Sequence, residues 1–194
     1  MRIVGILLAA GQGARFGGGK LMAPLPAASH GVAAGTPIGV ASAAHLVAAL
    51  GEVVAVVRPR DPALHDALNG AGARVVECAR ADEGMGASLA HAIAATADAD
   101  GWVVALADMP WLAPATIDAV AAALREGASL AAAAYRGERG HPVGFAAMFG
   151  PQLRGLTGDE GARAVVAAHR AHMRVVDVDD AGVLRDVDRP GDLR

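Results

Sequence analysis

A glycine-rich segment near the N-terminus carries two cations at a spacing suited to binding a polyphosphate. It runs from Gly11 to Lys20 and includes Arg15. Glycines let the backbone approach a ligand closely and point its amide N–H groups at an anion. Arginine adds a planar fork of donors, and lysine adds a point charge on a flexible stem. We therefore expect a phosphate-binding loop; the alternative is an ordinary tight loop with two solvated cations.

The residues just before this loop, Ile3–Leu8, are apolar or glycine and predict a buried strand of a parallel sheet. The loop lacks the spacing of the dinucleotide fingerprint G-x-G-x-x-G. It is not a Walker loop either, because Lys20 is followed by Leu21 and not by a hydroxyl residue. A dinucleotide-binding oxidoreductase fits poorly, since Arg58 follows the second predicted strand where an acidic residue is expected.

A second candidate for chemistry is Asp108, which directly follows an apolar run and precedes Met109-Pro110. Ligands of parallel α/β sheets bind at the carboxyl ends of the strands, so Asp108, the glycine-rich loop and the loop around Gly84 should share one edge. Magnesium prefers one or two carboxylates together with phosphate oxygens of a substrate. We expect Asp108 to bind Mg²⁺; the alternative is an aspartate that only caps the turn before Pro110.

The C-terminal segment Asp186-Val187-Asp188 offers a second carboxylate. If this segment is a strand, alternation places Asp186 and Asp188 on the same face. We favour Asp188 as the second metal ligand. The alternative is a solvated acidic C-terminus whose Pro190 begins a short helix.

The elements that must position these residues alternate between strand and helix through the first two-thirds of the chain. Strands are predicted at Ile3–Leu8, Val53–Val57, Arg74–Glu77 and Trp102–Ala107, with helices at about 37–50, 62–70, 85–97 and 114–126. This order predicts a Rossmann-like three-layer α/β/α fold with a mostly parallel sheet. Further strands at 129–135, 143–148, 173–178 and 183–187, a polar loop at 136–142 and a helix at about 160–169 would complete it, in part as an antiparallel addition.

Length and composition limit the remaining possibilities. The 194 residues favour a single domain, 1–194, and the 54% hydrophobic but 3% aromatic content predicts helices packed through small side chains. A net charge of −3 without a basic cluster argues against nucleic acid as a partner. A single cysteine, Cys78, and the absence of an apolar run near the ~20 residues of a membrane span predict a cytoplasmic protein with no membrane partner.

Several motifs together resemble those of the MobA-like NTP transferases, and among these the molybdenum cofactor cytidylyltransferases. They are Leu-Ala-Ala-Gly-x-Gly-x-Arg-x-Gly-x-x-Lys at 8–20, Gly-Met-x-x-Ser-Leu at 84–89, Ala-Asp-Met-Pro at 107–110, Gly-His-Pro-Val at 140–143, Gly-Asp-Glu-Gly-Ala-Arg at 158–163 and Asp-Val-Asp-Arg-Pro-Gly-Asp-Leu at 186–193. Two features depart from the family pattern. The segment 27–35 is longer and looser than the usual turn, and Arg189 replaces a typical threonine.

The resemblance implies a nucleotidyltransferase fold and a Mg²⁺-dependent transfer of CMP from CTP to the terminal phosphate of molybdopterin, or of its molybdenum form, with release of pyrophosphate. Leu-Ala-Ala-Gly is similar to the cytidylyltransferases, whereas guanylyltransferases usually have Leu-Ala-Gly-Gly. Open alternatives are GTP as the donor, a sugar phosphate or methylerythritol phosphate as the acceptor, and a non-catalytic chaperone of the molybdenum cofactor. A molybdenum hydroxylase or its chaperone is the implied protein partner.

The same resemblance implies roles for individual residues. The catalytic residues would be Arg15 and Lys20, which would hold the β- and γ-phosphates, and Asp108, which would bind the metal together with Asp188. The nucleotide would contact Leu8, Ala9, Ala10, Gly11, Gly13, Arg15, Lys20, Gly84 and Ser88. The acceptor would contact His141, Pro142, Asp159 and Arg163, with His141 at a pterin edge and Arg163 at the acceptor's phosphate.

Overall fold

A seven-stranded sheet forms the centre of the protein in a computed structural model that describes residues 1–193. The strand order is β3-β2-β1-β4-β6-β5-β7. The strands are β1 (Ile3–Leu8), β2 (Val53–Val57), β3 (Arg74–Glu77), β4 (Gly101–Leu106), β5 (Leu130–Tyr135), β6 (Glu138–Ala146) and β7 (Met173–Asp177). β6 runs antiparallel to β4 and β5, and the other neighbouring pairs are parallel. The predicted mostly parallel sheet with an antiparallel addition is confirmed.

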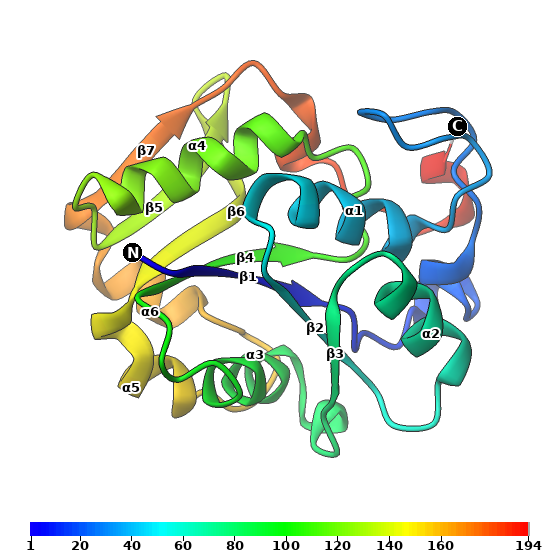
Figure 1. Cartoon of the computed structure of the whole chain (residues 1–194), viewed down its shortest axis with the longest axis horizontal. Helices are drawn as coiled ribbons and strands as arrows, with labels where there is room; N and C mark the ends of the chain where they lie inside the picture. The colour runs from blue at the N-terminus through cyan, green and yellow to red at the C-terminus, as the bar shows by residue number, and fades with distance from the viewer. Residues whose placement is uncertain (194) are drawn as a thin grey trace.

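Helices cover both faces of this sheet, as Figure 1 shows. One face carries α1 (Ile38–Leu50), α2 (Pro62–Gly70) and α4 (Pro114–Arg125), and the other carries α3 (Met85–Ala94), α5 (Gly150–Arg154) and α6 (Arg163–Ala168). The three-layer arrangement predicted from the alternation of strands and helices is therefore confirmed.

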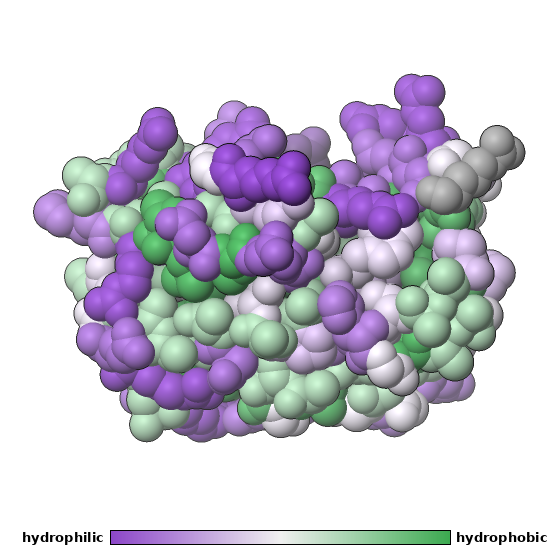
Figure 2. All heavy atoms as spheres, turned by 90° about the horizontal axis from the view of Figure 1, so that it is seen from above, coloured by the Kyte–Doolittle hydropathy of each residue, from purple (hydrophilic) through white to green (hydrophobic). Residues whose placement is uncertain are grey.

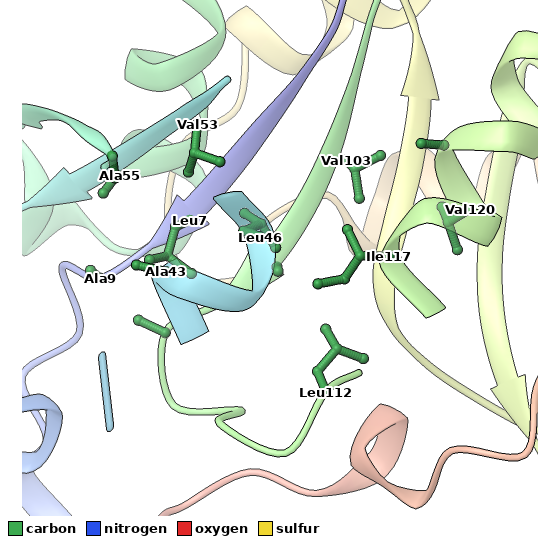
Figure 3. Close-up of a cluster of buried hydrophobic side chains, with 14 of the residues drawn as sticks. Leu7, Ala9, Ala43, Leu46, Val53, Ala55, Val103, Leu112, Ile117 and Val120 are labelled. Atoms are coloured by element: carbon green, nitrogen blue, oxygen red, sulfur yellow. The ribbon is translucent and has the colours of Figure 1, made fainter. Parts of the chain in front are cut away.

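The core holds the central strands rigidly. On the α1 and α4 face, Leu7 and Val103 of the sheet pack with Leu46 of α1 and with Ile117 of α4 (Figure 3). All six residues of β1 are buried, as expected for a parallel strand covered on both faces. Because β1 lies between β2 and β4, its position fixes where the glycine-rich loop leaves the sheet.

The face seen in Figure 2 is mostly a mixture of hydrophilic and weakly hydrophobic side chains, with smaller areas of strongly hydrophobic ones among them. The large hydrophobic residues that are exposed in the described chain are Met1, Met22, Met85, Met148 and Val175. They come from separate segments, and isolated exposed apolar residues are normal on proteins. Within residues 1–193, no helix has both the length and the apolar character needed to cross a membrane.

The predicted strand at 183–187 is wrong. A short 3₁₀ turn, Ala181–Leu184, lies there, and the residues after it do not join a strand. The Asp180 carboxylate accepts the N–H of Gly182 at 2.8 Å and begins the turn. Gly182 also lies so close to the preceding loop that an added Cβ would be 2.2 Å from the carbonyl oxygen of Trp111. Contacts with other parts of the chain, and not strand pairing, hold this apolar segment.

The prediction of a polar loop at 136–142 is also wrong. β5 and β6 form a hairpin with only Arg136 and Gly137 between them, both at positive φ (50° and 81°). A two-residue turn of this kind matches the twist of its flanking strands. The other predicted elements are present with shifted ends; the helices predicted at 85–97 and 160–169, for example, are shorter.

The long segment before α1 is tied to the loop that follows Asp108. Ser29 Oγ donates to the carbonyl oxygen of Pro110 at 3.1 Å, and a His30 ring nitrogen lies 3.0 Å from the carbonyl oxygen of Trp111. His45 of α1 is buried, and its Nε2 lies 3.1 Å from the Ser29 carbonyl oxygen. The segment therefore links α1 to the end of β4.

His45 should make stability depend on pH. Burial lowers the pKa of His45 below its usual value and outweighs the hydrogen bond to Ser29. The unfolded chain then binds protons more readily than the folded chain as the pH falls below about 6.5, so the free energy of unfolding decreases in that range. We predict that His45→Gln makes this decrease shallower in urea denaturation between about pH 7 and 5. The exposed His91, changed to Gln, is the control, and equal slopes for all three proteins would contradict the assignment.

Candidate active site

Three aspartates meet at the carboxyl edge of the sheet. Asp108 follows β4, while Asp186 and Asp188 come from the C-terminal segment. Figure 1 shows this red segment beside the blue N-terminal loop. One carboxylate oxygen from each aspartate lies within 4.8 Å of the others. We call these three residues the carboxylate cluster.

The carboxylate cluster fits a divalent cation. Asp108 Oδ1 is buried and has no hydrogen-bond partner among residues 1–193. A carboxylate oxygen that is buried without a donor is costly unless another ligand compensates it. Carboxylate oxygens at this spacing are the donors that Mg²⁺ and similar hard cations prefer. The cluster contains both Asp108 and the favoured Asp188, and it adds Asp186.

Backbone contacts place the two C-terminal aspartates beside Asp108. The N–H of Val187, which lies between them, donates to the carbonyl oxygen of Asp108 at 2.9 Å. Further along, Asp192 Oδ2 accepts the N–H groups of Asp188 at 2.9 Å and Arg189 at 2.7 Å. These two bonds lower the pKa of Asp192, with the Arg189 N–H as the larger cause. Asp192 therefore fixes the turn from which Asp188 projects.

The two predicted cations pair with the carboxylate cluster. Lys20 Nζ lies 2.6 Å from Asp108 Oδ2 and 3.9 Å from Asp188 Oδ1. Arg15 Nη1 lies 2.5 Å from Asp188 Oδ2. The Lys20 side chain is only 12% exposed, whereas that of Arg15 is 73% exposed, so solvent screens the Arg15 pair far more. The structure thus brings Arg15, Lys20, Asp108 and Asp188 together, as the sequence predicts.

A cleft of about 430 Å³ opens beside this cluster. Of the predicted residues, it is lined by Leu8, Ala10, Gly11, Lys20, Gly84, Ser88, Asp108 and Asp159. Ala9 and Gly13 line a smaller adjoining hollow of about 140 Å³, which shares Lys20 and Gly11 with the cleft. The glycine-rich loop and the start of α3 therefore face one space.

Glycine is needed where α3 begins. Gly84 has a φ of 118°, and a Cβ on it would lie 2.3 Å from Asp159 Oδ1. The N–H of Gly86 donates to the carbonyl oxygen of Gly158 at 2.8 Å. Two motifs that are far apart in the sequence thus form one wall of the cleft, and the partial positive charge of a helix N-terminus lies at that wall.

Three predicted acceptor contacts lie outside the residues that line the cleft. Arg163 is exposed at the first residue of α6, and Pro142 is buried in β6. His141, also in β6, lies near Asp108 and Asp186, whose charges favour its protonated form. Burial has the largest effect and lowers the pKa of His141, although a backbone hydrogen bond at Val104 and these two charges raise it. Of the four predicted acceptor contacts, Asp159 lines the cleft, whereas His141, Pro142 and Arg163 do not.

Arg58 is a cleft residue that the sequence analysis used only as a negative argument. Its Nε donates to the carbonyl oxygen of Ala10 at 2.7 Å, and its guanidinium pairs with Asp82. Both side chains line the cleft. The position of Arg58 in the sequence could have identified it as a site residue. It follows β2 at the same edge of the sheet where Asp108 follows β4.

The family follows from a direct comparison. Residues 5–173 match the model of the MobA-like NTP transferase domain. The chain belongs to this family. It is 30% identical over 202 residues to the purine catabolism protein PucB of Bacillus subtilis (strain 168), covering 97% of this chain and 92% of PucB. Membership makes the chain a nucleotidyltransferase-type protein.

Solved structures agree with this family. The crystal structure of Rv0371c from Mycobacterium tuberculosis H37Rv is 29% identical with a TM-score of 0.79, and the match covers 99% of this chain and 95% of that one. A structure of Rv0371c in complex with manganese is 26% identical with a TM-score of 0.75, covering 99% of this chain and 96% of that one. Both structural matches extend over nearly the whole of this MobA-like chain.

Asp192 should control how tightly the carboxylate cluster binds a metal. Removing its carboxylate in Asp192→Ala frees the N–H groups of Asp188 and Arg189, so the Asp188 side chain loses its fixed position. We predict a 10- to 100-fold loss of Mn²⁺ affinity, roughly the effect of removing an outer-shell partner of a metal ligand. Electron paramagnetic resonance titration of free Mn²⁺ measures this. Asp192→Asn keeps an acceptor oxygen and should bind nearly as the wild type does; equal losses in both variants would contradict this role.

Proposed function

We propose that this protein transfers CMP from CTP to the terminal phosphate of molybdopterin, or of its molybdenum form, and releases pyrophosphate, with residues 1–194 acting as a single domain. One observation carries the proposal: Lys20 and Asp108 lie 2.6 Å apart on the wall of a cleft that the glycine-rich loop also lines. A cation, a metal-binding carboxylate and backbone amides in one cleft are what a nucleoside triphosphate requires.

The transfer is a displacement at the α-phosphorus of CTP. An oxygen of the acceptor's phosphate forms a bond to this phosphorus, and the bond from phosphorus to the α,β-bridging oxygen breaks. Pyrophosphate leaves with that electron pair, and CMP remains joined to the acceptor through a phosphoanhydride. The nucleophile is already anionic at neutral pH, so no general base is needed.

The side chains of the site position the reactants and balance charge. In this proposal, Lys20 and Arg15 move from the carboxylate cluster to the β- and γ-phosphates and stabilise the charge of the departing pyrophosphate. Asp108 and Asp188, with Asp186 beside them, would hold Mg²⁺, which would supply positive charge to the phosphates of the nucleotide. The manganese complex of Rv0371c supports a divalent cation in a related protein.

In this proposal the cleft takes a pyrimidine nucleotide in preference to a purine nucleotide. Ala10 lines the cleft, and its methyl group would occupy space that a purine base needs. Arg58 holds the Ala10 carbonyl oxygen at 2.7 Å and so keeps this wall in place. GTP in place of CTP is the alternative that the same cleft leaves open.

Calorimetric titration separates these nucleotides. We predict that CTP binds in the presence of Mg²⁺ at least about tenfold more tightly than GTP, roughly the effect of a small steric difference in a pocket. Ala10→Gly should reduce the difference in affinity between CTP and GTP, because it makes room for the larger purine base. Tighter binding of GTP by the wild type would contradict CMP transfer and favour the guanylyl alternative.

Catalysis should depend on the pair that lines the cleft. We predict that Lys20→Ala and Asp108→Ala each slow pyrophosphate release from CTP and molybdopterin by about 10²–10³-fold, the scale of losing one electrostatic stabiliser. Arg125→Ala, which removes an exposed surface cation on α4, is the control and should leave the rate unchanged. A wild-type rate in either cleft variant would refute its role, and cofactor binding without any nucleotide turnover would favour a chaperone.

A further inference from the structure

A second hollow adjoins the carboxylate cluster and is separate from the nucleotide cleft. Its volume is about 450 Å³, and it is lined by Tyr135, Ala181, Leu184, Arg185, Asp186 and Asp192. None of these residues lines the first cleft. The carboxylate cluster lies between the two spaces, since it contributes Asp108 to the cleft and Asp186 to the second hollow.

The topology places this hollow at the carboxyl edge of the sheet, where ligands of parallel α/β sheets usually bind. β4 and β5 both run antiparallel to β6, so their carboxyl ends lie at the same edge of the sheet. Tyr135 is the last residue of β5, and Asp108 follows the end of β4. Only β6 separates these two strands, which puts their ends about 10 Å apart at the usual strand spacing. A small molecule in the hollow can therefore reach the cluster.

The hollow combines one cation, Arg185, with the apolar surface of Tyr135 and Leu184. Two carboxylates also line it, but Asp186 belongs to the carboxylate cluster and Asp192 accepts two backbone N–H groups. The Arg185 guanidinium lies 3.5 Å from the centre of the Trp111 ring, and Arg136 lies 5.0 Å from that of Tyr135. Among residues 1–193, no carboxylate forms an ion pair with either arginine. A guanidinium held flat on an indole keeps its donor edge for a phosphate or carboxylate. Tyr135 and Leu184 supply apolar surface for a ring beside it.

We propose that the second hollow is the acceptor site, which takes a phosphorylated small molecule with a flat ring, and that Arg185 is its main anion-binding residue. This inference rests on the proposed function. The acceptor's phosphate then approaches the α-phosphorus from the Asp186 side of the cluster, while pyrophosphate leaves toward Lys20 on the cleft side. An in-line displacement needs its entering and leaving oxygens on opposite sides in this way. In this proposal Arg185 and Tyr135 contact the acceptor, in place of the predicted His141, Pro142, Asp159 and Arg163.

Ligand-observed NMR with phenyl phosphate tests this site without knowledge of the natural acceptor. Phenyl phosphate combines a phosphate monoester with a flat ring. The nucleotide cleft is first saturated with Mg²⁺ and α,β-methylene CTP, which cannot transfer its CMP. We predict that the wild type binds the probe and that Arg185→Met weakens binding at least about tenfold, roughly the effect of losing one charged hydrogen bond.

Two further variants make the result decisive. Leu184→Trp, which fills the hollow, should weaken phenyl phosphate binding to a similar degree. Arg125→Met removes an exposed cation on α4 that lies outside the hollow and should leave phenyl phosphate binding unchanged. All three variants should bind α,β-methylene CTP within about twofold of the wild type, and this measurement also reports that they are folded.

The two proposals fail in different ways. If the wild type binds the nucleotide but does not bind phenyl phosphate, the acceptor site is wrong and the proposed function stands. The same conclusion follows if Arg185→Met and Leu184→Trp both bind the probe as the wild type does. If the wild type binds no nucleotide with Mg²⁺, the proposed function itself fails.

Discussion

Charge balance within the carboxylate cluster is the constraint on which the rest of the site depends. Three carboxylates, each with one oxygen within 4.8 Å of the others, repel one another, and solvent screens this repulsion least at the half-buried Asp108 and Asp188. In the protein alone, Lys20 and Arg15 offset this repulsion. A triphosphate would draw these cations to its own negative charges and leave the carboxylates without them. In the proposed reaction a divalent cation would then replace the two side chains, so the cluster would couple nucleotide binding to metal binding.

The fold meets this constraint by bringing together both ends of the chain. β1 delivers the glycine-rich loop, and β4, its neighbour in the sheet, delivers Asp108 to the same edge. The C-terminal segment then crosses this edge, where the Val187 N–H bonds to the Asp108 carbonyl oxygen. The same crossing leaves a space on either side of the cluster, and the proposed transfer reaction would use one space for each of its two substrates.

The sequence predicted the parts of this arrangement that depend on local pattern. Apolar runs gave β1, β2 and β4, and Asp108 was found because a polar residue directly after such a run lies at the edge of the sheet. The prediction failed at 183–187, where the apolar pattern arises from packing against Trp111 and β6 and not from strand pairing. Arg58 and Arg185 were missed as site residues because their neighbours, Asp82 and Trp111, are distant in sequence and only the folded chain brings them together.

The most direct test of this account is a crystal structure of the protein with Mn²⁺ and α,β-methylene CTP, in which anomalous scattering locates the metal. The account predicts one manganese ion bound by Asp108 and Asp188 and by an oxygen of the α-phosphate, with Lys20 moved from Asp108 to the β- or γ-phosphate. A nucleotide bound away from the carboxylate cluster, or a manganese ion at another place in the protein, would contradict it.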